Sequence, residues 1–265
     1  MYNYIFNFRT NILGFAMYSI AHYQMELTNA EDKATFRKMK QQIQPFKGIR
    51  GVPFSVVAQL LDEDPTLNVE NQSDEVHALF MSSFEEGLIA IGLLSVAVLT
   101  QPEQSWNLAQ KWLSMVDDVT TADALGKIVI GPCALLLDID IPSEIENHQS
   151  VFAKRSLLMA LSAYVPESPK GPWVSALRSH LQSEQVIFVE QAQTHHYSTL
   201  FKYFLKEEHP LLRKAIIQLL QLWSSHDLTS LDKILENHPQ NLPKWLKKSY
   251  EKGQKFYKRT YLNKT

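Results

Sequence analysis

The sequence predicts an all-α protein in which helices stack into a right-handed α-α superhelix. Apolar residues recur at spacings of three and four along nearly the whole chain, and no segment sustains a two-residue alternation. The 12 prolines fall between the apolar segments, where they separate helices. The 265 residues are 45% hydrophobic, which is enough apolar material for a sizeable core and excludes a disordered chain.

The expected helices follow one another with short connections. In chain order they cover residues 11–26, 29–44, 53–63, 73–80, 84–100, 104–115, 119–137, 150–165, 169–181, 185–194, 197–207, 210–225, 227–236 and 241–259. The first expected helix is amphipathic, as a packed helix is, because one face would carry Ile12, Phe15, Ala16, Ser19 and Ile20.

Start signals support several boundaries. Thr28 and Glu31 match a capping box near the start of the second expected helix. Ser83 stands directly before the helix that begins at residue 84, where it suits an N-cap. Pro210 occupies a first-turn position, which proline tolerates because its missing N–H has no partner there.

The expected helix 119–137 begins after two acids, Asp117 and Asp118. Acids at a helix N-terminus are stabilised by the macrodipole, and Thr120 or Thr121 would cap this helix. The most apolar helices, around 88–99 and 215–222, are too short for membrane spans and are expected in the core.

The spacing of the helices predicts the architecture. They run in pairs of about forty residues, which is typical of HEAT-type repeats. Because neither helix of a pair can bury its apolar stripe alone, neighbouring pairs would stack into a solenoid with a concave face that carries the function. Residues 1–265 are expected to form this single domain, with a basic helix or tail at residues 244–265.

The N-terminus has two interpretations. In the first, residues 1–16 are a poorly ordered or non-native extension, and Met17 is an alternative start. In the second, Arg9 and the apolar stretch 12–20 form a secretory signal peptide, with residues 19–21 resembling a cleavage site. The nearly uncharged segment before the stretch argues against export, and the stretch is too short to span a membrane.

Cysteine and histidine usage limits the chemistry. Cys133 has no second cysteine to pair with, so we expect a buried thiol in a reducing, cytoplasmic protein. The nine histidines include no HExxH motif, and we expect no metal and no cofactor. The chain also lacks Ser-His-Asp order, Walker glycines and Rossmann glycines.

Charge is distributed unevenly. The net charge of −2 gives no global basic field, but the segment 244–264 is rich in Lys and Arg and contains one acid, Glu251. Aromatic residues interleave with these cations, a combination that suits phosphate contact. The alternative is a solvated last helix whose aromatic residues pack on the preceding helix.

The order of several motifs resembles the HEAT-like-repeat DNA alkylation repair family, whose members are alkylpurine DNA glycosylases. The resemblance spans about residues 21–255. The matching motifs are MKQQIQPFKGI (39–49), with its Pro-Phe-x-Gly-Ile turn, the helix from Phe84 to Leu99, the segment 116–132, FAKRSLL (152–158) and the helix 211–223.

The resemblance implies roles for individual residues. Asp123 falls at the family's catalytic aspartate, and Arg155 at a basic residue that faces the DNA backbone. Further phosphate contacts would come from Lys154, Arg213 and Lys214, and the basic C-terminal segment would add Lys247 and Lys248. The positions that match the family's aromatic clamp carry Val119 and Gln218, and residues 53–57 replace basic residues that the family has after the Gly-Ile turn.

The implied reaction would be that of a monofunctional glycosylase of the 3-methyladenine and 7-methylguanine type. An alkylated purine is a cationic leaving group, so a carboxylate would only need to stabilise the developing oxocarbenium ion or position water. Without the clamp tryptophans, the expected function is recognition of damaged or irregular duplex DNA, with excision left open. In the structural alternative, Asp123 accepts hydrogen bonds from the backbone or from an arginine, and these bonds join adjacent repeats.

A second class of function is a HEAT-type scaffold that binds a protein or peptide in its groove, without a membrane or a metal. A basic concave face would favour DNA, whereas an exposed apolar patch would favour the scaffold. We expect Trp112, Trp173 and Trp223 to pack in the core, because their neighbours on the helix are apolar.

Overall fold

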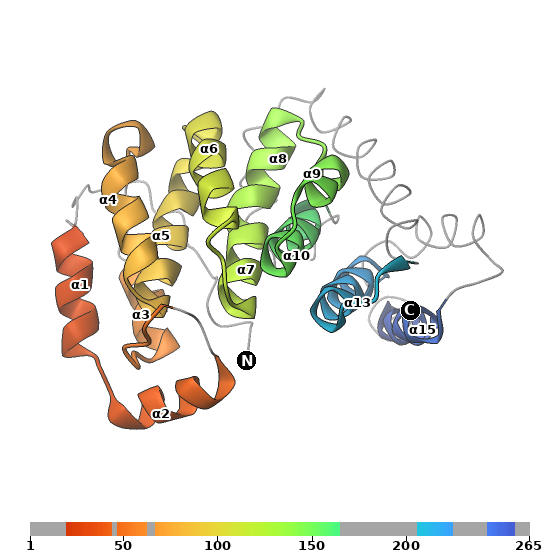
Figure 1. The fold of residues 1–265 in the computed structure, drawn as a ribbon, viewed down its shortest axis with the longest axis horizontal. Helices are drawn as coiled ribbons and strands as arrows, with labels where there is room; N and C mark the ends of the chain where they lie inside the picture. The colour runs from red at the N-terminus through yellow and green to blue at the C-terminus, as the bar shows by residue number, and fades with distance from the viewer. Residues whose placement is uncertain (1–19, 44–46, 63–66, 165–205, 225–242, 258–265) are drawn as a thin grey trace, which may run out of the picture.

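The computed structural model describes residues 20–43, 47–62, 67–164, 206–224 and 243–257 (Figure 1). Within these ranges every regular element is a helix, and the only bridge between extended residues joins Gly48 to Ser83. The predicted all-α class is therefore confirmed. The arrangement of the helices as a repeat superhelix stays a prediction.

The helices of the larger part follow the chain order. They are α1 (Ile20–Asn29), α2 (Lys33–Gln42), α3 (Phe54–Asp62), α4 (Val69–Ser82), α5 (Phe84–Ala97), α6 (Pro102–Leu113), α7 (Val119–Leu125), the π-helical turn η2 (Gly126–Ile130), α8 (Gly131–Leu137), α9 (Ile141–Asn147), α10 (Val151–Ala160) and the 3₁₀ turn η3 (Leu161–Tyr164). Then α13 (Pro210–Ser224) and α15 (Lys244–Tyr257) lie side by side at the C-terminal end of the molecule (Figure 1).

In the described ranges most boundaries lie close to those predicted, and one helix was missed. Helix α9 was not predicted, because its seven residues are too few for an apolar period. Several predicted helices lie outside the described residues, as does Trp173. These helices are 169–181, 185–194 and 227–236, most of 197–207 and the start of 11–26.

The core is organised around α5. Nearly every residue of this helix is buried, because α1, α3, α4, α6, α7 and η2 all pack against it. Trp112 of α6 is fully buried and stacks on Phe80 of α4 with ring centroids 4.3 Å apart, while its Nε1 donates to Nδ1 of His77 at 3.0 Å. Trp223 is also fully buried, so both described tryptophans of this set pack in the core, as predicted.

One continuous helix, Val119–Leu137, forms the middle of the molecule and contains the π turn η2. By length and composition it could cross a membrane, and 78% of this apolar stretch is buried inside the protein. It packs against α10 without intervening side chains at Gly126 and Gly131. A Cβ on Gly131 would lie 2.5 Å from the Ala160 carbonyl oxygen, and one on Gly126 would overlap the carbonyl oxygen of Ser156.

The caps confirm one start signal and correct two others. Ser83 caps α5 by accepting from the Glu86 N–H at 3.3 Å. The second helix begins later than predicted, because Asp32 caps α2, whereas Thr28 lies within α1 and donates to the Gln24 carbonyl. Asp118 itself caps α7 by accepting from Thr120 and Thr121, so neither threonine is the cap.

Candidate functional site

Asp123 of α7 and Arg155 of α10 form a buried ion pair. Arg155 Nε donates to Asp123 Oδ1 at 2.7 Å, and Nη2 donates to Oδ2 at 2.9 Å. Arg155 is 2% exposed and Asp123 is 4% exposed. This two-point geometry fits the planar guanidinium to the carboxylate and is among the strongest polar contacts a protein makes.

The same guanidinium reaches α13. Its Nη1 donates to the Leu211 carbonyl oxygen at 2.7 Å, and its Nη2 donates to Gln218 Oε1 at 3.2 Å. The Leu211 carbonyl lies in the first turn of α13 and Gln218 lies two turns further along. Arg155, which belongs to α10, therefore connects the central helix to α13.

The structure places the residues of the predicted site in two separate groups. Asp123 and Arg155 meet at this buried network, and the exposed residue Gln218 reaches it with its amide oxygen. Arg155 was expected to face DNA, but it points into the protein, because Asp123 provides the countercharge that a buried guanidinium needs. Gln218 uses its amide oxygen on Arg155, and Val119 is half-buried in the first turn of α7.

Lys127 is a further cation at this network, which was not among the residues predicted from the sequence. Burial lowers the pKa of its ammonium, the charge of Asp123 opposes that shift, and the charge of Arg155 adds to it. Lys127 therefore adds a second positive charge close to the ion pair of Asp123 and Arg155. The signal in the sequence was the spacing of four between Asp123 and Lys127, which puts both on one helical face.

Lys47 forms a second electrostatic cluster with Asp117 and Asp118. Its Nζ lies 3.4 Å from the centroid of the Phe80 ring and donates to the Phe80 carbonyl oxygen at 2.7 Å. Burial lowers the pKa of Lys47 to about 8, and the charges of the two aspartates oppose the shift. Burial also raises the pKa of Asp118, against its hydrogen bonds from residues 120 and 121.

The second group of predicted residues lies at the surface of the C-terminal helices. Lys214, Lys247 and Lys248 are exposed. Arg213 is half-buried, with Nε donating to the Glu207 carbonyl at 2.7 Å and its guanidinium 5.6 Å from the centroid of the Trp245 ring. Lys154 is half-buried on α10 and stands apart from the basic face of α15.

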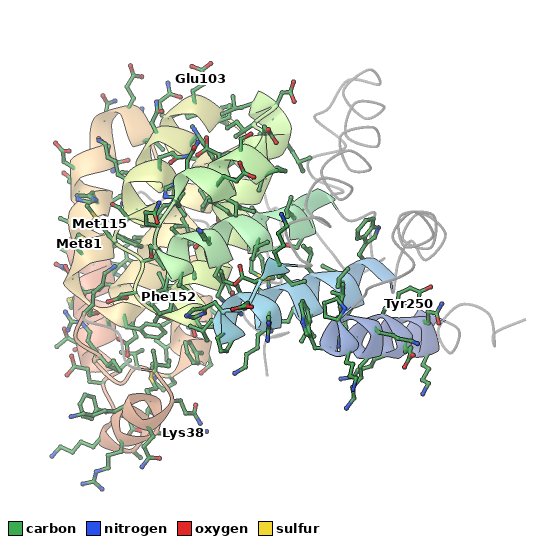
Figure 2. All side chains as sticks on the ribbon, turned by 45° about the vertical axis from the view of Figure 1, so that its right-hand side comes forward. Lys38, Met81, Glu103, Met115, Phe152 and Tyr250 are labelled. Carbon is green, nitrogen blue, oxygen red and sulfur yellow. The ribbon has the colours of Figure 1, made fainter. Side chains whose placement is uncertain are left out.

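The basic face of α15 comprises Lys244, Lys247, Lys248, Lys252 and Lys255, all of which are exposed. The opposite side of the helix packs against α13, with Leu246 buried and Trp245 and Tyr250 half-buried. Figure 2 shows nitrogen-tipped side chains that extend from α15 on the side away from α13. Trp245 and Tyr250 thus pack on the preceding helix while these five lysines remain in water.

In the described part of the chain, no group of three or more His, Cys, Asp or Glu side chains is arranged to hold a metal ion. Cys133 is a fully buried free thiol, and burial raises its pKa, so it has little thiolate character.

The chain matches no protein-family model, no curated protein and no solved structure. The resemblance to the DNA alkylation repair family therefore stays a prediction, and the two groups of residues are the basis for a proposed function.

Proposed function

We propose that this protein binds duplex DNA through the basic face of α15 together with Lys214 of α13. The observation that carries the proposal is the one-sided charge of α15, which exposes five lysines and a single acid, Glu251. A row of exposed cations on a packed helix lowers the free energy of a phosphate backbone placed against it, because condensed counterions are released.

The positive charge of α15 contrasts with the charge of the rest of the chain. Lys and Arg number 26 in the whole protein against 28 Asp and Glu, so a cationic helix implies an excess of acid elsewhere. A long polyanion is therefore attracted to one part of the molecule and repelled by others. Such polarity gives the bound DNA an orientation without contacts to the bases.

The placement of the aromatic residues favours a duplex over a single strand. Proteins that bind single strands present aromatic rings on which unpaired bases stack. Here Trp245 and Tyr250 are half-buried in the contact between α15 and α13, and Trp245 lies beside the Arg213 guanidinium. Among the described side chains of α15, the exposed ones are five lysines and Glu251, and exposed ammonium groups suit contact with phosphates.

An apolar groove for a peptide has less support in the described residues. The only large hydrophobic side chains that are exposed there are Met25 at 54% and Met81 at 44%. Scattered exposed residues of this kind are ordinary at a protein surface and do not form a binding patch.

We assign Asp123 a structural role within this function. Both of its oxygens accept hydrogen bonds from Arg155, so the carboxylate that would stabilise an oxocarbenium ion is already neutralised. Through Arg155 it instead orients α13, on which the DNA-binding helix α15 packs. Release of N7- or N3-alkylated purines that disappears in Asp123→Asn, while DNA binding persists, would overturn this assignment.

The proposal is tested by the salt dependence of DNA binding. We expect wild-type protein to bind a labelled, undamaged duplex with an affinity that falls steeply as salt rises. In Lys248→Glu, the slope of log K against log salt should decrease by about 0.9 for each phosphate that the variant no longer neutralises. Fluorescence anisotropy over a range of salt concentrations measures this slope.

The matched control is Lys111→Glu, which makes the same change in net charge at an exposed lysine on α6, away from α15 (Figure 1). We expect the control to bind DNA almost like wild type. Equal losses of affinity in the two variants would mean that only net charge matters, and an affinity insensitive to salt would show that the basic face of α15 does not bind phosphates.

A further inference from the structure

The helix α2 carries the strongest local excess of positive charge outside the C-terminal helices. Its ten residues include four cations, Lys33, Arg37, Lys38 and Lys40, and no acid. Only Met39 is buried, and all four cations are exposed. In Figure 1, α2 lies across the lower edge of the molecule, away from α13 and α15, and Figure 2 shows Lys38 at this outer edge.

The chain segments on either side of α2 are tied together. The Asp32 N–H, at the start of the helix, donates to the Gly51 carbonyl at 3.1 Å. Gly51 has a φ of +88°, and a Cβ there would lie 2.5 Å from Cβ of Phe36 in α2. Residue 51 must therefore be glycine, and this conformation places the segment that follows α2 directly against the helix.

Two buried acids of α5 hold this junction in place. Glu85 is fully buried and accepts from the backbone N–H groups of Arg50, Gly51 and Val52 at 3.0, 2.8 and 3.1 Å. Glu86 is 1% exposed and accepts from Arg50 Nη2 at 2.9 Å. The other terminal nitrogen of Arg50 donates to Thr28 and Glu31 beside the start of α2.

The junction is thus rigid, while the helix that it carries contacts the body through few side chains. The cations of α2 are also poorly compensated within the helix. Lys33 and Arg37 are four residues apart, and Arg37 and Lys40 are three apart, so these like charges repel each other across single turns. The nearby Asp32 carboxylate is used to cap the helix through the Thr35 N–H at 2.6 Å. A partner with regularly spaced negative charge would relieve this repulsion.

We infer that α2 is a second contact for the phosphate backbone of duplex DNA, presented by the junction of Asp32, Gly51 and Glu85. This inference rests on the proposed function. A phospholipid surface is a poorer fit, because a helix that lies on a membrane inserts large apolar side chains, and the exposed residues of α2 are Lys, Arg, Gln and Ala. The exposed Gln41 and Gln42 add neutral hydrogen-bonding groups that suit phosphate and sugar.

The test compares the salt dependence of DNA binding in four proteins: wild type, Arg37→Glu with Lys38→Glu, Lys248→Glu and the control Lys111→Glu. We expect the double variant of α2 to lower the slope of log K against log salt by about 2, because two phosphates are no longer neutralised. Its Kd at moderate salt should rise at least tenfold over that of wild type. Circular dichroism checks that the helical content is unchanged.

The outcomes separate the two proposals. If Lys248→Glu weakens binding but the α2 variant behaves like Lys111→Glu, the inference about α2 is wrong and the proposed function stands. If wild type shows no salt-dependent binding, both are wrong. Should the charge reversal disturb folding, Arg37→Gln with Lys38→Gln replaces it and is expected to lower the slope by a similar amount, since the same two cations are removed. A wild-type slope in that variant would also overturn the inference.

Discussion

The residue with the most partners in the buried network is Arg155, which binds one carboxylate, one carbonyl and one amide from two other helices. Sequence alone suggested Asp123 and Arg155 as separate functional residues, since no local pattern shows that side chains 32 residues apart meet. The structural alternative for Asp123, hydrogen bonds from an arginine that join neighbouring helices, is what the geometry displays. Burial favours the structural interpretation, because an unpaired buried guanidinium would be too costly.

Removing one partner of this pair should destabilise the protein more than removing both. Asp123→Leu leaves Arg155 buried without a countercharge, and we expect a loss of about 3–5 kcal/mol in the free energy of unfolding. Asp123→Leu combined with Arg155→Met removes both charges, so the double variant should lose less than the sum of its single variants. Urea denaturation of the four proteins in this cycle measures the coupling, and strictly additive losses would contradict a direct ion pair.

Lys47 should give the protein a distinct pH dependence. Its pKa is lowered from 10.5 to about 8 by burial, so between these pH values the unfolded chain binds more protons at this residue than the folded protein does. Stability attributable to Lys47 must therefore rise with pH in this window, and the full cost of burying the charge is present below pH 8.

The measurement is the free energy of unfolding of wild type and Lys47→Met from pH 8 to pH 10.5. We expect the wild type to gain stability relative to Lys47→Met as pH rises, because the variant has no group to deprotonate there. Other lysines and tyrosines titrate in both proteins and cancel in the difference. Parallel curves would mean that the Lys47 ammonium is solvated.

Among the elements, the continuous helix from α7 to α8 depends most on its glycines. Gly126 opens the π turn and faces the backbone of α10, where an added methyl group would overlap the Ser156 carbonyl. We expect Gly126→Ala to cost about 1–3 kcal/mol or more, since backbone on the facing helix must move. Gly48→Ala is the control, because nothing lies within 4 Å of a Cβ there. Equal thermal stability of both variants would contradict this close packing.

Helices with a long apolar period were predicted correctly. Features that depend on a few residues or on local hydrogen bonds were not. The span 119–137 was predicted as one helix, but its π turn was not predicted. A single π turn shifts the spacing of the apolar residues too little to be recognised over so few residues. Short α9 carried too little pattern. At α2 and α7 the predicted threonine caps were wrong, since nearby aspartates accept the N–H bonds.

Over the whole molecule, charge separates the interior from the proposed binding surface. The charged residues buried in the described part, such as Glu85, Asp123 and Arg155, are paired with protein groups and serve to hold helices together. The cations of α2 and α15 have no such role. The sequence shows that these helices are rich in cations. It does not show that the cations are exposed, because exposure depends on which face of each helix packs against the protein.

Contact between the exposed lysines of α15 and DNA can be measured by amine footprinting. Acetylation of each lysine is measured by mass spectrometry in the free protein and at saturating duplex DNA. We expect Lys244, Lys247 and Lys248 to become protected and Lys111 to react equally in both states. Unchanged reactivity of the α15 lysines, or equal protection of Lys111, would contradict this contact.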